Sequence, residues 1–434
     1  MNCFQTYLNK IILNLKLFLG GKMELYFSSN YDTNSLFLLQ IPHNLLDNLE
    51  KEEELIIKGT SPTILCTKDK GYELKLLETT NTLLLIKDNE EDPNKKEIIL
   101  KADHSIEATS ITPRKFYVYN LLKKFCTLKY DISTGENNLS SFKQKYTVKN
   151  LFSLCDLPST QFDKLIKETH IFQYNNDIAC IYDFNFLTEF VGPLLKAISY
   201  NNKSKFNSLN ELFDILVNTD SNMSIVVEKL NQNEKKNLVE YIGDINNTDE
   251  KNVEIALNVE KIKKFIAKSL FYSNKDDNKF EFKLVNFIQL FNNALSIYLP
   301  IELYEEESRT MNKYLTESSC EDNLYPYYKD FDIRFLLGKS IIYMSKSYNE
   351  PLIKWIDISQ LSEKFEERIN ELYLMKSTWS MKELELFLKD LEIGNLHDRI
   401  MRLTRPFQED NIFDKNKKNS MLYLKKNPFF NKKI

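Results

Sequence analysis

Glycine and proline are both scarce in this chain, with 9 glycines and 11 prolines among 434 residues. Loops that bind phosphate through backbone amides need glycine, because a Cβ blocks the close approach, so few such loops are expected. The same scarcity disfavours an all-β architecture built on glycine turns along the whole chain. At about 150 residues per domain, the length indicates about three domains.

Metal-ligand patterns are also missing from the sequence. The six cysteines and four histidines are widely scattered, and no C-x-x-C pair occurs. A zinc site needs four converging ligands, usually in closely spaced pairs, so no metal site is predicted. We expect the cysteines to be reduced and mostly buried thiols of a cytosolic or nuclear protein.

Charge of one sign does not dominate the composition. Lysine and arginine number 58, and aspartate and glutamate 62, so the net charge is −4. This balance argues against a protein that coats nucleic acid or membrane over its whole surface. No segment is long and apolar enough to cross a bilayer. Residues 1–22 contain an interrupted apolar stretch; we interpret it as an amphipathic appendage or an extension of the gene model, since a signal peptide fits poorly.

The apolar pattern that is present predicts an α+β multidomain protein with an N-terminal β-barrel-like domain over residues 23–111. Short strand-like runs alternate there with turn-forming or charged clusters. In one run Tyr72, Leu74 and Leu76 share a face, while the charged residues between them point the other way. This period of two is typical of a half-buried strand.

After this domain the period becomes helical, and residues 112–145 are predicted to form a helix and a polar linker. Residues 146–200 then have the order helix, turn, helix, hairpin, with Asn175-Asn176 as the hairpin turn. This order is the layout of a winged-helix unit, and its loose recurrence predicts tandem units. The remaining regions are a helical and winged-helix middle part over residues 201–357 and a C-terminal basic winged-helix unit over residues 358–434.

Motifs of known enzymes do not occur. The sequence contains neither G-x-S-x-G nor H-E-x-x-H. Gly338-Lys339-Ser340 matches the end of a nucleotide-binding P-loop, but Ile333 stands where that loop needs a glycine, so a strand edge is the better interpretation. Carboxylates are plentiful, yet spacing alone does not show that two of them share a site. We therefore predict no enzyme and no catalytic, cofactor-binding or metal residue.

The C-terminus carries the most informative charge. Residues 397–434 include ten basic and four acidic residues, a net +6, which leaves −10 for the rest of the chain. Arg399, Arg402 and Arg405 recur every three residues and are expected to share one helix face before Pro406 ends the helix. Such a face suits sequence-independent contact with DNA phosphates. The predicted DNA-binding residues are Arg399, Arg402, Arg405, Lys415, Lys417, Lys418, Lys425 and Lys426. The alternative is a solvated tail that reflects a lysine-rich composition.

Residues 66–86, CTKDKGYELKLLETTNTLLLI, resemble the N-terminal domain of the sister chromatid cohesion protein Dcc-one family. That family has a cysteine, a K-D-K turn, a strand of Tyr, an acidic residue, Leu and Lys, and then a T-N-x-L-L strand. The residues of this chain that match these assembly strands are Lys68, Asp69, Lys70, Tyr72, Leu74, Asn81, Leu83 and Leu84. The preceding LLQIPHNLLDNLEKEEELIIKG, Tyr146-Thr147 and the stretch around Arg368 and Trp379 are also similar to the family.

The resemblance implies a non-catalytic subunit of an alternative replication factor C clamp loader. The implied partners are the large Ctf-type ATPase, its small Ctf partner, the replication factor C small subunits, DNA polymerase epsilon and DNA, with the sliding clamp as an indirect partner. The β-domain is then the assembly module, and the winged-helix array contacts DNA. The resemblance further implies a nuclear protein of DNA replication and sister chromatid cohesion, with no cofactor and no membrane partner.

A different class of protein also fits the winged-helix pattern, namely a free-standing transcriptional regulator. Such a protein needs a recognition helix rich in Arg, Asn or Gln aimed at base edges. The helix expected at Phe162–Lys167 offers two lysines and no arginine, which is poor for reading sequence directly.

Overall fold

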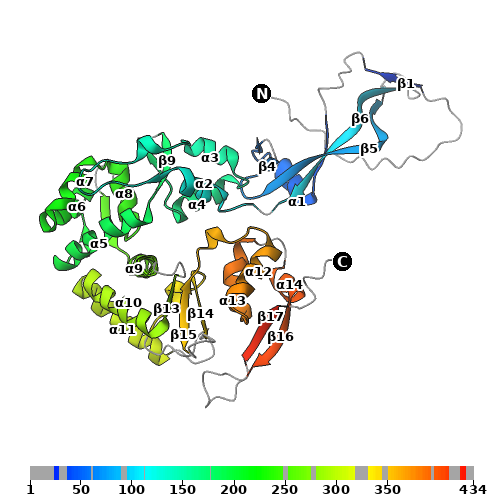
Figure 1. Cartoon of the computed structure of the whole chain (residues 1–434). Coiled ribbons are helices and arrows are strands. Elements are labelled where there is room, and N and C mark those ends of the chain that lie inside the picture. Colours follow the sequence, from blue (N-terminus) through cyan, green and yellow to red (C-terminus); the bar gives the residue numbers. More distant parts are fainter. Residues whose placement is uncertain are drawn as a thin grey trace. The chain divides into compact units, whose positions relative to one another are not determined.

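The computed structural model describes residues 24–28, 37–59, 62–88, 95–111, 113–175, 177–247, 253–274, 280–317, 331–344, 350–391, 395–409 and 421–426 (Figure 1). The fold is mixed α+β, as predicted. It divides into two compact units: the first comprises residues 1–53 and 72–110, and the second comprises residues 54–71 and 111–434. The finer boundaries drawn from the sequence stay predictions.

The first unit is built around two long antiparallel strands, β5 (Gly71–Asp88) and β6 (Lys95–Ser110). On its other side β6 pairs in parallel with β1 (Glu24–Phe27) and with β2 (Leu38–Gln40). One helix, α1 (His43–Glu50), belongs to this unit. Within the described residues these strands form an open sheet and not a closed barrel, so the barrel-like form predicted for this part is not found. A barrel needs its first and last strands to pair, and here β1 and β2 both pair with β6.

The second unit begins with a hairpin of β3 (Ile56–Lys58) and β4 (Thr63–Cys66). Two helices follow residue 145, namely α3 (Val148–Leu154) and α4 (Ser159–Glu168). A capping box formed by Thr147 and Asn150 begins α3. The predicted hairpin is confirmed as β8 (Phe172–Tyr174) and β9 (Ile178–Tyr182), with Asn175 at φ +48° in the turn. The other elements of this part are α2 (Tyr117–Phe125), β7 (Thr127–Leu128), η1 (Leu139–Ser141) and α5 (Phe184–Tyr200).

The middle of the second unit is mainly helical and contains two small three-stranded sheets, β10-β12-β11 and β13-β15-β14. Their strands are β10 (Lys205–Phe206), β11 (Gly243–Asn247), β12 (Val253–Leu257), β13 (Glu281–Lys283), β14 (Ser340–Met344) and β15 (Pro351–Trp355). The helices are α6 (Leu209–Thr219), η2 (Ser221–Met223), α7 (Ser224–Lys229), α8 (Gln232–Glu240), α9 (Val259–Ser273), α10 (Leu284–Tyr298), α11 (Ile301–Glu317) and η4 (Arg334–Leu336).

The end of the chain has three helices followed by an antiparallel hairpin. These elements, preceded by η5 (Ile358–Gln360), are α12 (Phe365–Met375), α13 (Met381–Leu388), η6 (Lys389–Leu391), α14 (Leu396–Leu403), β16 (Thr404–Glu409) and β17 (Met421–Lys426). Trp379, immediately before α13, forms a β-bridge with Leu424 of β17, so the hairpin is anchored to the helices.

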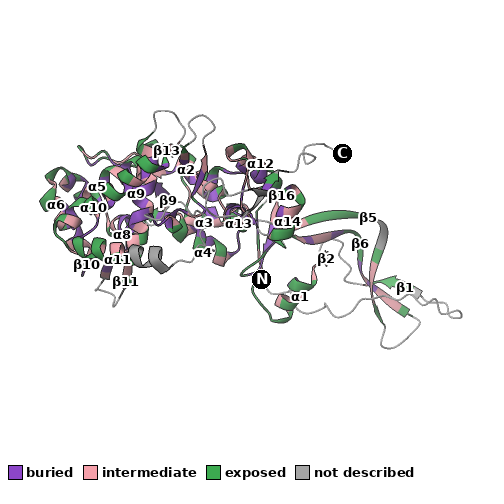
Figure 2. Ribbon diagram, turned by 90° about the horizontal axis from the view of Figure 1, so that it is seen from below, coloured by how far each residue is buried: buried purple, intermediate pink, exposed green. Residues whose placement is uncertain are grey.

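Burial differs sharply between the two units (Figure 2). The second unit holds a large aromatic-rich core that includes Phe190, Phe271, Phe287 and Phe291, all almost fully buried. A separate core around Trp379 supports the C-terminal helices. In the first unit long stretches of β5 are exposed (Figure 2). The second unit is therefore a well-packed body, whereas much of the sheet of the first unit is uncovered.

Candidate assembly and nucleic-acid interfaces

The K-D-K turn of the family motif packs against the start of α4. The Thr160 hydroxyl donates a hydrogen bond to the Lys68 carbonyl (2.9 Å), and the Gln161 amide donates one to the Asp69 carbonyl (2.9 Å). The side chains of Lys68, Asp69 and Lys70 are exposed. The Asp69 carboxylate also accepts from the Thr160 hydroxyl (3.0 Å). The turn therefore attaches the β3–β4 hairpin to α4, and these contacts explain its defined shape without a partner protein.

Lys58, at the end of β3, was not singled out from the sequence. Its side chain is buried, and its ammonium donates hydrogen bonds to the carbonyls of Leu157 (2.5 Å) and Phe152 (3.2 Å). The ammonium also lies 3.6 Å from the centroid of the Phe152 ring. A cation suits the free carbonyls at the C-terminal end of α3 because of the helix dipole. The only signal in the sequence is a lysine at the end of an apolar strand, which is too common to be informative.

The cysteines near Lys58 behave as structural thiols. Cys66 and Cys155 are buried, like Cys126 and Cys180, and all four are free, as predicted. Burial raises the pKa of the Cys66 and Cys155 thiols, against the opposing effect of the Lys58 charge. Because the thiolate is the reactive form, these thiols are unreactive at neutral pH. Cys3 and Cys320 lie outside the described residues.

The motif residues of β5 divide between the core and the surface. Tyr72 is fully buried, and burial raises the pKa of its hydroxyl, which has no hydrogen-bond partner within the described residues. Leu74 and Leu84 are half-buried, and Leu83 is exposed. Asn81 lies where the pairing with β6 shifts register between Glu78 and Leu83; its side chain lies outside what the structure describes.

The core face predicted for Tyr72, Leu74 and Leu76 ends early, because Leu76 is 64% exposed. Leu76 belongs to a group of exposed large apolar side chains in the first unit, which we call the apolar sheet surface; the group includes both faces of the sheet, because neighbouring strand residues such as Leu76 and Leu77 point to opposite sides. Its members are Leu25, Tyr26, Phe27, Phe37, Leu38, Leu76, Leu77 and Leu83. Exposed apolar groups gathered on one small sheet mark an interaction site more often than chance.

The basic C-terminal residues lie on two different elements. The helix α14 ends at Leu403, and Arg405 lies on β16, so the prediction that three arginines share one helix face is wrong. The helix stops before Arg405 because Thr404 takes extended geometry and pairs with Lys426 in the hairpin. The guanidinium of Arg399 packs over the Phe365 ring, 4.0 Å from the centroid. Arg399 is therefore less available for contact with DNA than an arginine on an open surface.

The remaining positive charge is concentrated at the hairpin. Arg402 and Arg405 are exposed, and Arg405 lies directly across from Lys425, which is also exposed. Arg405 and Lys425 therefore place two like charges side by side on the hairpin. We call Arg402, Arg405 and Lys425 the basic C-terminal surface. Lys415, Lys417 and Lys418 lie outside the described residues, as does the side chain of Lys426.

Arg368 and Trp379 are structural residues of the C-terminal core. Arg368 is fully buried, and its guanidinium pairs with the Asp390 carboxylate (2.7 Å) while also donating to the Ser362 carbonyl (2.6 Å). Trp379 is fully buried and donates from its indole to the Lys376 carbonyl (2.9 Å). These residues hold the helices that position the basic C-terminal surface.

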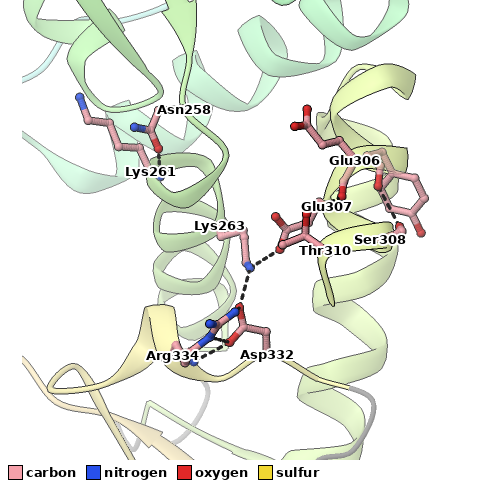
Figure 3. Close-up of polar contacts among 10 residues, drawn as sticks. Asn258, Lys261, Lys263, Glu306, Glu307, Ser308, Thr310, Asp332 and Arg334 are labelled. Carbon is pink, nitrogen blue, oxygen red and sulfur yellow. Dashed lines mark hydrogen bonds and ion pairs between the residues drawn. The ribbon is translucent and has the colours of Figure 1, made fainter. Parts of the chain in front are cut away.

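An ion cluster joins three segments in the middle of the second unit (Figure 3). Lys263 of α9 pairs with Glu307 of α11 (2.5 Å) and with Asp332 (3.4 Å), and Asp332 also accepts from Arg334 (2.8 Å). Burial alone would raise the pKa of Asp332, but hydrogen bonds from Arg334 and the Lys263 charge lower it overall. All these charges are paired, so the cluster fastens α11 and η4 to α9.

The described ranges also bear on metal binding, on membrane spans and on the P-loop-like triplet. No group of three or more His, Cys, Asp or Glu residues there converges to hold a metal ion, and no described helix is long and apolar enough to span a membrane. Ser340 begins β14, and Gly338 forms a turn before it at φ +73°. The strand-edge interpretation of this P-loop-like triplet is therefore confirmed.

The chain is similar to proteins of one known family. The family model described as Sister chromatid cohesion protein Dcc1 matches residues 36–388, more than half of the chain. The probable sister chromatid cohesion protein DCC1 of Dictyostelium discoideum is 31% identical over 116 residues, which cover 26% of this chain and 30% of that protein. The sister chromatid cohesion protein DCC1 of Danio rerio is 34% identical over 64 residues, covering 14% of this chain and 16% of that protein. These alignments therefore span less than a third of either relative's length. The chain belongs to the sister chromatid cohesion protein Dcc1 family.

Proposed function

We propose that the chain is a non-catalytic nuclear subunit of an alternative replication factor C clamp loader. In this role it joins the large Ctf-type ATPase and its small Ctf partner to DNA and to DNA polymerase epsilon. Loading of the sliding clamp, and with it cohesion during DNA replication, depends on this positioning. ATP hydrolysis then belongs to other subunits.

The observation that carries the proposal is the apolar sheet surface. Leu76, Phe27 and Phe37 are 64%, 55% and 67% exposed, although large apolar side chains favour burial by about 1.5–3 kcal/mol each. A partner that covers them recovers much of this free energy. An open sheet that carries a family motif, and that no layer covers among the described residues, suits a module that is completed by other subunits.

The basic C-terminal surface supports contact with DNA. Three helices followed by a hairpin, with Trp379 bridged to Leu424, have the order of a winged-helix unit. Exposed Arg402, Arg405 and Lys425 gather at its hairpin. Arginine and lysine side chains of this kind bind phosphates and position a protein on DNA without reading its sequence.

Reconstitution tests the assembly part of the proposal. The chain is co-expressed with the two Ctf-type subunits and analysed by size-exclusion chromatography with mass detection. We expect a single peak that contains all three chains in fixed proportion. Elution of this chain alone, beside a complex of the other two, would contradict the proposal.

A DNA titration separates the adaptor from the transcriptional regulator. Binding is measured for a set of duplexes of unrelated sequence at several salt concentrations. The adaptor is expected to bind all of them with similar affinity and with a steep dependence on salt. Tight binding of one duplex, a thousandfold or more above the others, would favour the regulator, because specific proteins reach such ratios.

A further inference from the structure

The segment that precedes β1 has apolar residues at helical spacing, although it lies outside the described residues. At about 3.6 residues per turn, a helix over residues 4–19 has one apolar side and one polar side. The polar side carries Lys10, Lys16 and four uncharged polar residues, together with Leu13 and Leu17. The sequence therefore predicts an amphipathic helix, which needs an apolar surface to pack on. Its apolar side includes Phe4, Leu8, Ile11, Leu15, Phe18 and Leu19.

The strand that follows this segment presents apolar side chains to solvent on one face of the sheet. Leu25 and Phe27 of β1 are 47% and 55% exposed, and residues two apart in a strand point to the same side. Phe27 lies directly across from Ile98 of β6, which lies across from Ile86 of β5, so these three share that face. Leu84 shares it too, because the register shift beside Ile86 adds a residue to β6 and not to β5. We call Leu25, Phe27, Leu84 and Ile86 the β1-end face.

The β1-end face is distinct from the places where Leu76 and Leu83 are exposed. Leu76 lies beyond the register shift between Glu78 and Leu83, in the part of the sheet where β6 pairs with β2. Leu83 precedes Leu84 in β5, so it points to the opposite side of the sheet. A segment that covers the β1-end face therefore leaves Leu76 and Leu83 open to another subunit.

Chain connectivity favours the preceding segment as the occupant of the β1-end face. Residues 20–23 alone separate the predicted helix from Glu24, the first residue of β1, and they include Gly20 and Gly21. Glycine adopts both signs of φ, so the chain can turn back there over the strand that it precedes. A helix over residues 4–19 is about 24 Å long, and residues 83–88 of β5 span about 20 Å. A tethered occupant also has a high effective concentration.

A membrane surface is the other surface that suits a basic amphipathic helix. Residues 1–22 contain three lysines and no acidic residue, which suits anionic headgroups. Helices that lie on membranes have a polar side rich in lysine and arginine. Here that side carries only Lys10 and Lys16, and Leu13 and Leu17 interrupt it. The adjoining sheet is therefore the better match.

We propose that residues 4–19 form an amphipathic helix that packs on the β1-end face of the same chain. The apolar side of the helix then covers Leu25 and Phe27, and the open sheet gains a layer on that face. The helix also protects β1, whose listed pairing is with β6 on one side, from pairing with other chains. The proposal does not depend on the clamp-loader role, because both parts of the contact belong to this chain.

Two matched variants of the full chain test the contact. The first, Leu8→Asp with Leu15→Asp, places two charges on the apolar side of the predicted helix. The second, Leu13→Asp with Leu17→Asp, places the same two charges on its polar side. The variants have the same composition and net charge, so a difference between them reports which side of the helix packs.

The measurement is hydrogen–deuterium exchange read by mass spectrometry. We expect the backbone amides of residues 24–28 and 83–88 to exchange about tenfold faster in L8D/L15D than in the wild type, because an uncovered strand opens more easily. The L13D/L17D protein should exchange like the wild type. Amides of α9, which belongs to the second unit, should exchange alike in all three proteins and show that the rest of the fold is intact.

Two results would overturn the proposal. The first is equal exchange of residues 24–28 and 83–88 in all three proteins, or the same acceleration in both variants. The second is sedimentation of the wild-type chain with vesicles of phosphatidylcholine and phosphatidylserine, lost in L8D/L15D, while exchange in β1 stays unchanged. That result would assign the segment to a membrane surface and not to the β1-end face.

Discussion

Two leucines of β5 give a quantitative test of the apolar sheet surface. Leu76 is 64% exposed and Leu83 is 46% exposed, so a partner that covers both would bury about one leucine's worth of apolar surface. At about 2 kcal/mol for a buried leucine, changing both to serine should cost about 2 kcal/mol of binding free energy. This corresponds to about 30-fold in the dissociation constant.

The assay is biolayer interferometry between the purified variant and the complex of the two Ctf-type subunits. The control is Leu374→Ser, since Leu374 on α12 is 87% exposed and lies outside the apolar sheet surface. All these variants should keep their stability within about 0.5 kcal/mol, because the side chains are already exposed. Wild-type affinity in the L76S/L83S protein would refute the reasoning, as would an equal loss in the control.

Three further predictions concern the second unit. Changing the residues of the basic C-terminal surface to glutamate should weaken DNA binding, measured by fluorescence anisotropy, and should leave assembly intact. The slope of log affinity against log salt concentration should fall by about 2–3. An unchanged slope would contradict the assignment of this surface to DNA. Asp390→Ala should cost about 3–5 kcal/mol in urea unfolding, because it leaves the buried Arg368 charge unpaired, whereas Asp390→Leu with Arg368→Met should cost less. The pKa of Asp332 is lower in the folded protein than its ordinary value of 3.8. The Asp332 carboxylate therefore stabilises the fold fully when the pH is above 3.8, and this stabilisation is lost as the pH falls through the lower pKa of the folded state. Asp332→Asn should therefore flatten the acid limb of the stability curve, and an unchanged limb would show that the ion cluster does not stabilise the fold.

Local patterns in the sequence predicted local structure well. The hairpin at Asn175 forms because a residue that tolerates positive φ lies between two alternating runs. The strand that begins at Ser340 forms because Ile341, Ile342 and Tyr343 favour extended backbone. In both cases the deciding residues are neighbours in the chain.

Features that depend on distant contacts were predicted less well. Leu76 follows the same period as Tyr72, yet only Tyr72 is covered, since the period shows which residues share a face and not whether anything covers it. Arg405 follows Arg402 at helical spacing, but pairing of β16 with β17 ends the helix first. The role of Lys58 depends on carbonyls more than 90 residues away.

The central claim is that this chain acts as an adaptor in a clamp loader. The most direct test is affinity purification of the tagged protein from its own cells at moderate salt, followed by mass spectrometry. The proposal predicts recovery of the large Ctf-type ATPase, its small partner and the replication factor C small subunits in comparable amounts. Recovery of the protein alone, or together with transcription machinery, would contradict it.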